Sequence, residues 1–66
     1  MHAWEAIEGA LDFIEEHLQE DISTEALAQS AGLSPFYFQR LFKRLTGRPV
    51  LEYVKMRRLA MAASVL

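Results

Sequence analysis

Apolar residues recur every three or four positions along most of the chain, and this spacing places them on one face of an α-helix. The pattern predicts four helices, over residues 3–19, 24–31, 35–46 and 50–65. We therefore expect an all-α fold. The spacing is most regular in the first helix, where we expect Trp4 to anchor the core and where the apolar positions are Trp4, Ile7, Leu11, Ile14 and Leu18.

The third helix has clear signals at both ends. Ser34 can cap its start, and Pro35 suits the first helical position because the N–H that proline lacks would have no partner there. Gly47 suits the position just past its end, where the backbone turns left-handed. These signals bound the helix at residues 35–46, in agreement with its apolar spacing.

A tight turn joins the second helix to the third. Ser23 or Thr24 can cap the second helix, and Gly32 can supply the left-handed turn that follows it. The small Ala28 lets another backbone approach closely, and Leu33 can plug the corner. Helix, glycine turn and helix in this order predict a helix-turn-helix, in which the third helix projects from its partner.

The third helix carries two different faces. We expect one face to be buried, and it consists of Phe38, Leu41, Phe42 and Leu45. The opposite face is polar and aromatic, with Tyr37 and Arg44 on its flanks and, along its centre, Phe36, Gln39, Arg40 and Lys43. One helix therefore presents a core stripe and, on its other side, a stripe of aromatic, amide and cationic groups.

Composition limits the chain to one small domain. Its 66 residues are 52% apolar, which is enough for a packed core, and it contains no cysteine for a disulfide or a thiolate metal site. No apolar run approaches the roughly 18 residues that a membrane span needs, and no signal-peptide pattern opens the chain. We therefore expect a soluble, cytoplasmic protein with no membrane partner.

The net charge of −2 conceals a strong asymmetry. Residues 1–39 hold eight acidic residues and no lysine or arginine, whereas residues 40–66 hold all seven basic residues and one acid, Glu52. The two parts therefore carry −8 and +6. A local basic surface can attract phosphates even in an acidic protein. The alternative is that the two charged surfaces are solvated helix faces that attract each other.

The exposed residues of the third helix have the chemistry for reading DNA. A major groove admits an α-helix, and there arginine can pair with guanine, glutamine with adenine, and an apolar group can pack on a thymine methyl. Arg40, Gln39 and Phe36 supply these three contacts. The alternative is plain helix surface for Gln39 and Arg40, and a partly buried staple for Phe36. Phosphate contacts, which position the helix, are expected from Tyr37, Lys43, Arg44, Arg48, Lys55, Arg57 and Arg58.

Two segments form a distinctive combination: A-L-A-Q-S-A-G-L-S-P-F-Y-F-Q-R-L-F-K-R-L-T-G at residues 26–47 and E-Y-V-K-M-R-R-L at 52–59, followed by A-x-x-V-L at 62–66. In this combination the chain resembles the DNA-binding region of the AraC/XylS family of bacterial transcription regulators. The resemblance implies a homeodomain-like fold in which a long helix joins two helix-turn-helix units. Residues 1–66 would hold the first unit with its joining helix, residues 50–66, and the second unit would be absent from the chain.

The resemblance also implies roles for individual residues. Matched to the family's motif, Phe36, Gln39 and Arg40 face the bases, and Lys43 is a basic position on the same face. Phe36 stands where some members carry tryptophan, so its contact would be apolar only. The implied function is sequence-specific DNA binding in a transcription regulator, with double-stranded DNA as the partner and a possible effector domain elsewhere in the protein.

A second hypothesis is that the last helix serves protein–protein interaction or self-association. Residues 59–66 carry no charge, and the contacts within residues 51–66 would be made by Leu51, Val54, Leu59, Met61, Val65 and Leu66. Catalysis is a more distant alternative, because His2 and His17 have no partners that would complete a metal set or a nucleophile and base pair. We therefore expect no enzymatic activity, no metal and no cofactor.

Overall fold

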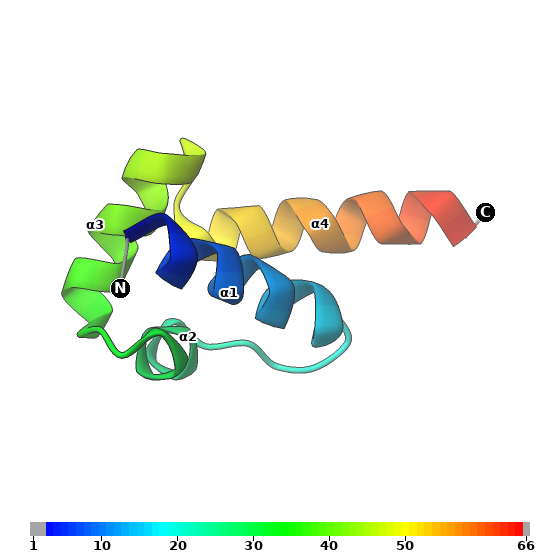
Figure 1. Cartoon of the computed structure of the whole chain (residues 1–66). Coiled ribbons are helices and arrows are strands. Elements are labelled where there is room, and N and C mark those ends of the chain that lie inside the picture. Colours follow the sequence, from blue (N-terminus) through cyan, green and yellow to red (C-terminus); the bar gives the residue numbers. More distant parts are fainter. Residues whose placement is uncertain (1–2, 66) are drawn as a thin grey trace.

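The computed structural model of the protein describes residues 3–65, with side chains up to Ala63. All regular structure in this range is helical, in the order α1 (Ala3–Glu16), α2 (Thr24–Ala31), α3 (Pro35–Thr46) and α4 (Val50–Val65) (Figure 1). The all-α prediction is confirmed, and α2, α3 and α4 have the predicted bounds. Predictions that concern His2, Leu66 and the side chain of Val65 lie outside the described residues.

The first helix is shorter than predicted, because α1 ends at Glu16 rather than at residue 19. At that point the backbone begins to tighten: the His17 N–H is shared between the Phe13 (3.1 Å) and Ile14 (3.2 Å) carbonyls, and the Glu20 N–H donates to the His17 carbonyl (3.0 Å). Leu18 is still buried, at 5% exposure. The apolar spacing therefore continued past the helix because the tighter turn also points Leu18 inward.

The turn between α2 and α3 follows the predicted signals. The Ser23 hydroxyl, rather than that of Thr24, accepts a hydrogen bond from the Ala26 N–H (3.1 Å) and caps α2. Gly32 is left-handed, with φ at +73°, and the Leu33 N–H donates back to the Ala28 carbonyl (2.9 Å). These bonds direct the chain from α2 into α3 and produce the predicted helix-turn-helix.

The core is formed where all four helices meet. Phe42 packs edge-on against Tyr53 of α4, with ring centroids 5.6 Å apart, and lies beside Phe38 at 5.8 Å. The buried residues come from every helix and from the turn after α1, and they are Ile7, Ala10, Ile14, Leu18, Leu27, Ala28, Phe38, Phe42, Val50 and Val54. This core holds the inner side of α3 and leaves its outer side in solvent.

Two expected core residues lie outside this core. Trp4 is 49% exposed, because α1 is rolled so that its small residues Ala6 and Ala10 face its neighbours and the indole lies at the margin. Leu45 is 39% exposed, because it lies in the last turn of α3, which extends past α1 (Figure 1). Leu41 is half-buried. The prediction of a fully buried stripe on α3 is therefore wrong at its C-terminal end.

The fourth helix leaves the body of the protein as a straight rod (Figure 1). Its first two turns are packed in the core through Val50 and Val54, whereas Leu51 and Leu59 are 54% and 63% exposed. The molecule measures 39 Å along its longest axis and 21 and 17 Å across. Half of α4 therefore presents apolar side chains to solvent.

Candidate nucleic-acid interface

The backbone of α3 is fixed at both ends. The Ser34 hydroxyl accepts a hydrogen bond from the Tyr37 N–H (3.2 Å), and Pro35 occupies the first turn. At the other end Gly47 has φ at +81°, and its N–H donates to the Lys43 carbonyl (2.8 Å). Both caps were predicted from the sequence. Together with the buried Phe38 and Phe42 rings, they set which residues of α3 point outward.

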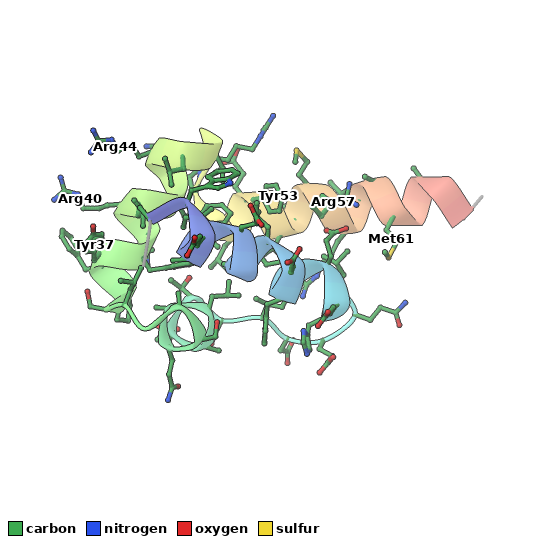
Figure 2. All side chains as sticks on the ribbon, in the orientation of Figure 1. Tyr37, Arg40, Arg44, Tyr53, Arg57 and Met61 are labelled. Atoms are coloured by element: carbon green, nitrogen blue, oxygen red, sulfur yellow. The ribbon has the colours of Figure 1, made fainter. Side chains whose placement is uncertain are left out.

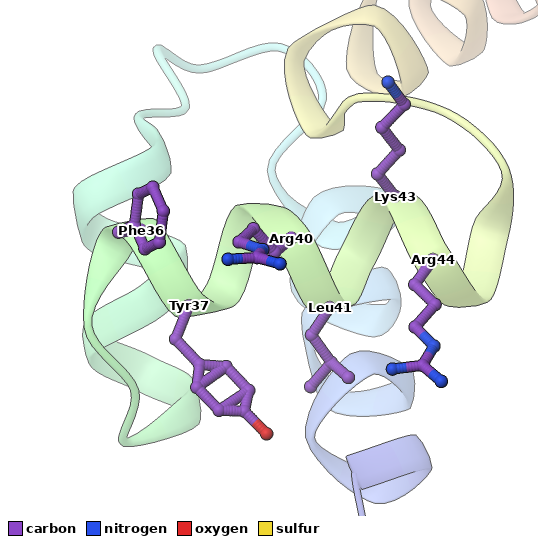
Figure 3. Close-up of a pocket in the computed structure, with 6 residues that line it drawn as sticks. All are labelled: Phe36, Tyr37, Arg40, Leu41, Lys43 and Arg44. Atoms are coloured by element: carbon purple, nitrogen blue, oxygen red, sulfur yellow. The ribbon is translucent and has the colours of Figure 1, made fainter.

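The outward residues form one continuous surface, the reading face, which consists of Phe36, Tyr37, Gln39, Arg40, Lys43 and Arg44. At about 100° per residue they cover an arc of about 160°, and all six are exposed. Figure 3 shows Arg40 near the centre, with Phe36 and Lys43 on one side of the helix and Tyr37 and Arg44 on the other. The structure thus brings together on α3 all three predicted base contacts and three of the predicted phosphate contacts.

Phe36 and Arg40 form a pair within the reading face. The guanidinium carbon of Arg40 lies 5.5 Å from the centroid of the Phe36 ring, within the range of a cation–π contact. The ring is 71% exposed, so it is not the partly buried staple that was the alternative for Phe36.

Two open hollows flank the reading face. The larger, of about 700 Å³, is lined by Phe36, Tyr37, Arg40, Leu41, Lys43 and Arg44 (Figure 3). The second, of about 370 Å³, reaches the start of α4 and is lined by Thr24, Gln39, Arg40, Lys43, Pro49, Val50 and Leu51. Arg40 and Lys43 border both hollows. The hollow that Gln39 shares with Pro49 and the start of α4 was not predicted, since helical spacing within α3 carries no information about its neighbours.

The predicted phosphate contacts differ in how strongly other residues of the chain hold them. Among residues 3–65, no ion pair or side-chain hydrogen bond involves Lys43, Arg44 or Lys55, and all three are exposed. Arg48 approaches Glu52 at 4.0 Å, but both side chains are at least half exposed, so this pair holds it weakly. These four cations remain available to a polyanion.

Arg57 is held by an acidic partner on α1. Its Nε and Nη2 donate to the two carboxylate oxygens of Glu15, at 2.9 and 2.8 Å. These hydrogen bonds and the opposite charge lower the pKa of Glu15 and raise the pKa of Arg57 from their ordinary values. The pair also neutralises an acid near the C-terminus of α1, where the helix dipole disfavours negative charge.

Arg58 is held by backbone carbonyls that follow α1. Its Nε donates to the Leu18 carbonyl oxygen (2.8 Å) and its Nη2 to the Glu20 carbonyl oxygen (2.5 Å). Both carbonyls lie just past the end of α1, so Arg58 ties α4 to the turn that follows α1. We call Arg57 and Arg58 the clamp. Their phosphate roles stay predictions, but the structure gives both guanidiniums partners within the chain. Arg57 is labelled on α4 in Figure 2.

Residues 3–65 form neither a metal cluster nor a membrane span. No group of three or more histidine, aspartate or glutamate side chains there could hold a metal ion. His17 instead stacks on Phe13, with centroids 4.0 Å apart, and its Nδ1 lies 2.8 Å from the Phe13 carbonyl oxygen. No helix in the same range is long and apolar enough to cross a membrane.

Comparison with known proteins gives a consistent result. Residues 14–55 match the family model of bacterial regulatory helix-turn-helix proteins, AraC family. Over 66 residues the chain is 38% identical to the uncharacterized HTH-type transcriptional regulator YbfP of Bacillus subtilis, covering 100% of this chain and 22% of YbfP. It is 33% identical over 57 residues to the regulatory protein SoxS of Salmonella typhimurium, covering 86% and 53% of the two chains.

A third relative is the multiple antibiotic resistance protein MarA of Salmonella typhimurium, 33% identical over 60 residues, which are 91% of this chain and 47% of MarA. The chain thus spans about half or less of the length of these curated relatives. No solved structure matches the chain. The three relatives share with it the segment that contains α2, the glycine turn and α3.

Proposed function

Since this chain belongs to the AraC family of bacterial regulatory helix-turn-helix proteins and is a DNA-binding unit of a transcription regulator, we propose that α3 reads base edges in the major groove. The observation that carries the proposal is the reading face, a continuous exposed surface whose residue types match base and phosphate chemistry. An α-helix with its side chains is about 10–12 Å across, which fits a major groove about 12 Å wide.

The proposed base contacts are Gln39, Arg40 and Phe36. Arg40 lies at the centre of the reading face, from which its two-pronged guanidinium can reach guanine O6 and N7. Gln39 lines the hollow that reaches Pro49 and Leu51, and its amide suits adenine N6 and N7.

The proposed phosphate contacts surround these base contacts. They are the exposed groups Tyr37, Lys43, Arg44, Arg48 and Lys55. Arg57 and Arg58 are assigned a different task, because each already donates two hydrogen bonds within the chain. We propose that they hold α4 against α1 and thereby orient the reading face relative to the rest of the protein.

The same family membership supports a proposal about architecture. We propose that a second helix-turn-helix unit packs on the projecting part of α4 in the whole protein, where the exposed Leu59 offers an apolar contact. An effector domain and a cytoplasmic location fit such a regulator, and the proposal includes no catalytic step. Self-association through α4 remains the competing use of this surface, but no feature favours it over a second unit.

The test begins with selection of a preferred duplex from a random-sequence DNA library by the 66-residue chain. Affinities are then measured for that duplex, its single-base variants and random DNA. Arg40→Ala is expected to remove about 1–3 kcal/mol of discrimination at one base pair. Gln39→Ala should reduce discrimination at a different base pair. Gln19→Ala, which removes an exposed amide from the turn after α1, should change discrimination at neither base pair.

Lys55→Ala provides the contrast. It should weaken binding to all sequences alike and lower the dependence of log affinity on log salt by about 1. Equal losses on specific and random DNA for Arg40→Ala would contradict the assignment of Arg40 to a base. Selection of no preferred sequence would contradict the proposed reading by α3.

A further inference from the structure

We propose that Phe36 is a positioning residue for Arg40, whose guanidinium it holds over its ring in the orientation needed to read a base. This inference rests on the proposed function, because it concerns how the central base contact is prepared. It also changes the role expected for Phe36, from a direct apolar contact with DNA to a support for its neighbour.

The Phe36 ring is held close to Arg40. Phe36 lies four residues before Arg40, so the two side chains are neighbours on one face of the helix. The Ser34 cap and Pro35 fix the backbone immediately before Phe36, so the position of its Cα is well defined. With 71% of the residue in solvent, the ring has little role in the core. The centroid of the ring lies 5.5 Å from the guanidinium carbon of Arg40.

A ring can orient a guanidinium without occupying its hydrogen-bond donors. Arg57 is oriented by the Glu15 carboxylate, which accepts hydrogen bonds from its Nε and Nη2 and offsets its charge. A ring face orients a guanidinium through its quadrupole and takes up none of the N–H donors that lie along the guanidinium edge. Arg40 therefore keeps its charge and its pair of donors for guanine, while losing rotamer freedom before DNA arrives.

No other side chain of α3 can orient Arg40. The helix contains no aspartate or glutamate, and among residues 3–65 no hydrogen bond or ion pair with a side chain involves Arg40. A carboxylate on this face would repel phosphates, whereas a phenyl ring carries no net charge. Phe36 is thus suited to support a cation on a surface that approaches a polyanion.

The experiment is a double-mutant cycle on the preferred duplex and on its variant at the base pair that Arg40 reads. Phe36→Ala alone should reduce discrimination at that base pair about two- to fivefold, which is the fold-change equivalent to a cation–π contact of about 0.5–1 kcal/mol. In the Arg40→Ala background the same substitution should cause no further loss. A loss of equal size in both backgrounds would overturn the proposal.

Two further substitutions separate a ring support from an apolar contact. Phe36→Trp, which keeps a strong π face, should retain discrimination, whereas Phe36→Leu, which keeps apolar bulk but has no π face, should lose as much as Phe36→Ala. If Phe36 instead packs on a thymine methyl, Phe36→Leu would retain binding. In that case, exchange of one thymine for uracil would weaken the unmodified chain but not Phe36→Ala.

A measurement without DNA keeps the inference separate from the proposed function. In the free chain, NMR resonances of the Arg40 side-chain protons should be shifted by the ring current of Phe36 and should return to ordinary values in Phe36→Leu. Circular dichroism should show the same helix content in both chains. Unshifted Arg40 resonances would overturn the proposal. If the Arg40 resonances are shifted but no preferred duplex is selected, the result would count against the DNA-reading role alone.

Discussion

The protein has two basic regions that look alike in the sequence and differ in what they contact. On α3, Lys43 and Arg44 are exposed and form no ion pair with any residue from 3 to 65. On α4, Arg57 and Arg58 are adjacent in sequence like that first pair, but they donate to a carboxylate and to two backbone carbonyls of the α1 region. Basic composition therefore does not by itself identify a DNA contact.

The difference follows from where the acidic residues lie. α3 carries no acid, so its cations have no partner within one or two turns. α4 passes the C-terminal end of the acidic α1, where Glu15 and the free carbonyls form a local negative site. The charge asymmetry thus has two components, a clamp that acts inside the domain and a reading face that is left free for a partner.

The largest effect expected from this contrast is on the salt dependence of DNA affinity. Replacing both Lys43 and Arg44 with alanine should lower the slope of log affinity against log salt by about 1.8, or 0.9 for each lost phosphate contact. Between about 50 and 200 mM salt, the fall in affinity should then be about twelvefold smaller than for the unmodified chain. Fluorescence anisotropy with random duplex DNA at several salt concentrations measures this slope.

Arg57→Ala is the matched control for that measurement. Because its guanidinium is already paired with Glu15, the slope should stay unchanged when it is removed. A slope that falls by about 0.9 in Arg57→Ala would show that DNA displaces Glu15 and that the original phosphate assignment for Arg57 is correct.

The second expected effect is on stability. Arg58→Met keeps the apolar stem of the side chain and removes the donors to the Leu18 and Glu20 carbonyls, so it should lower the free energy of unfolding by about 1–2 kcal/mol. Lys55→Met, on an exposed cation of the same helix without a partner in residues 3–65, should change it by less than about 0.5 kcal/mol. Urea unfolding followed by circular dichroism gives both values, and equal values would contradict the clamp.

Much of the fold was predictable because its signals are local. Serine caps, Pro35 and the two left-handed glycines lie within a few residues of the helix ends that they set, so the bounds of α2 and α3 followed from the sequence. The roll of α1 did not, because it depends on which neighbour comes close to Ala6 and Ala10. Trp4 was therefore placed in the core when it lies at its margin.

The candidate site was likewise predictable only in part. The reading face was predictable, since helical spacing alone puts Phe36, Gln39 and Arg40 on one surface. The clamp was not, because its partners lie 38 to 42 residues away in sequence. One signal pointed toward it: the acidic residues 1–39 and the basic residues 40–66 were open to the interpretation of helix faces that attract each other.

A smaller effect is expected from Gly9, in the middle of α1. Apart from its chain neighbours and the nearby backbone of α1 itself, no atom lies within 4 Å of the position that a Cβ would occupy there. Gly9→Ala should therefore raise the free energy of unfolding by about 0.5–1 kcal/mol through helix propensity. Gly9 lies on α1, away from the reading face, so DNA affinity and salt slope should be unchanged. A stabilised chain with altered DNA binding would contradict the separation of the clamp region from the reading region.

The smallest expected effect is the pH dependence of the clamp. The pKa of Glu15 in the folded chain lies below its ordinary value of 4.5, chiefly because Arg57 donates hydrogen bonds to the carboxylate. Since a lowered pKa means that the folded chain favours the ionised form, the stabilisation is fully present above pH 4.5 and is lost as the pH falls through the folded value. Unfolding free energies of the unmodified chain and of Glu15→Gln should therefore differ by a constant amount at neutral pH and converge below pH 4.5. The difference should be small and should shrink in high salt, because both side chains are more than one-third exposed. A difference that persisted undiminished in acid would mean that Glu15 stabilises the chain by packing rather than through its charge.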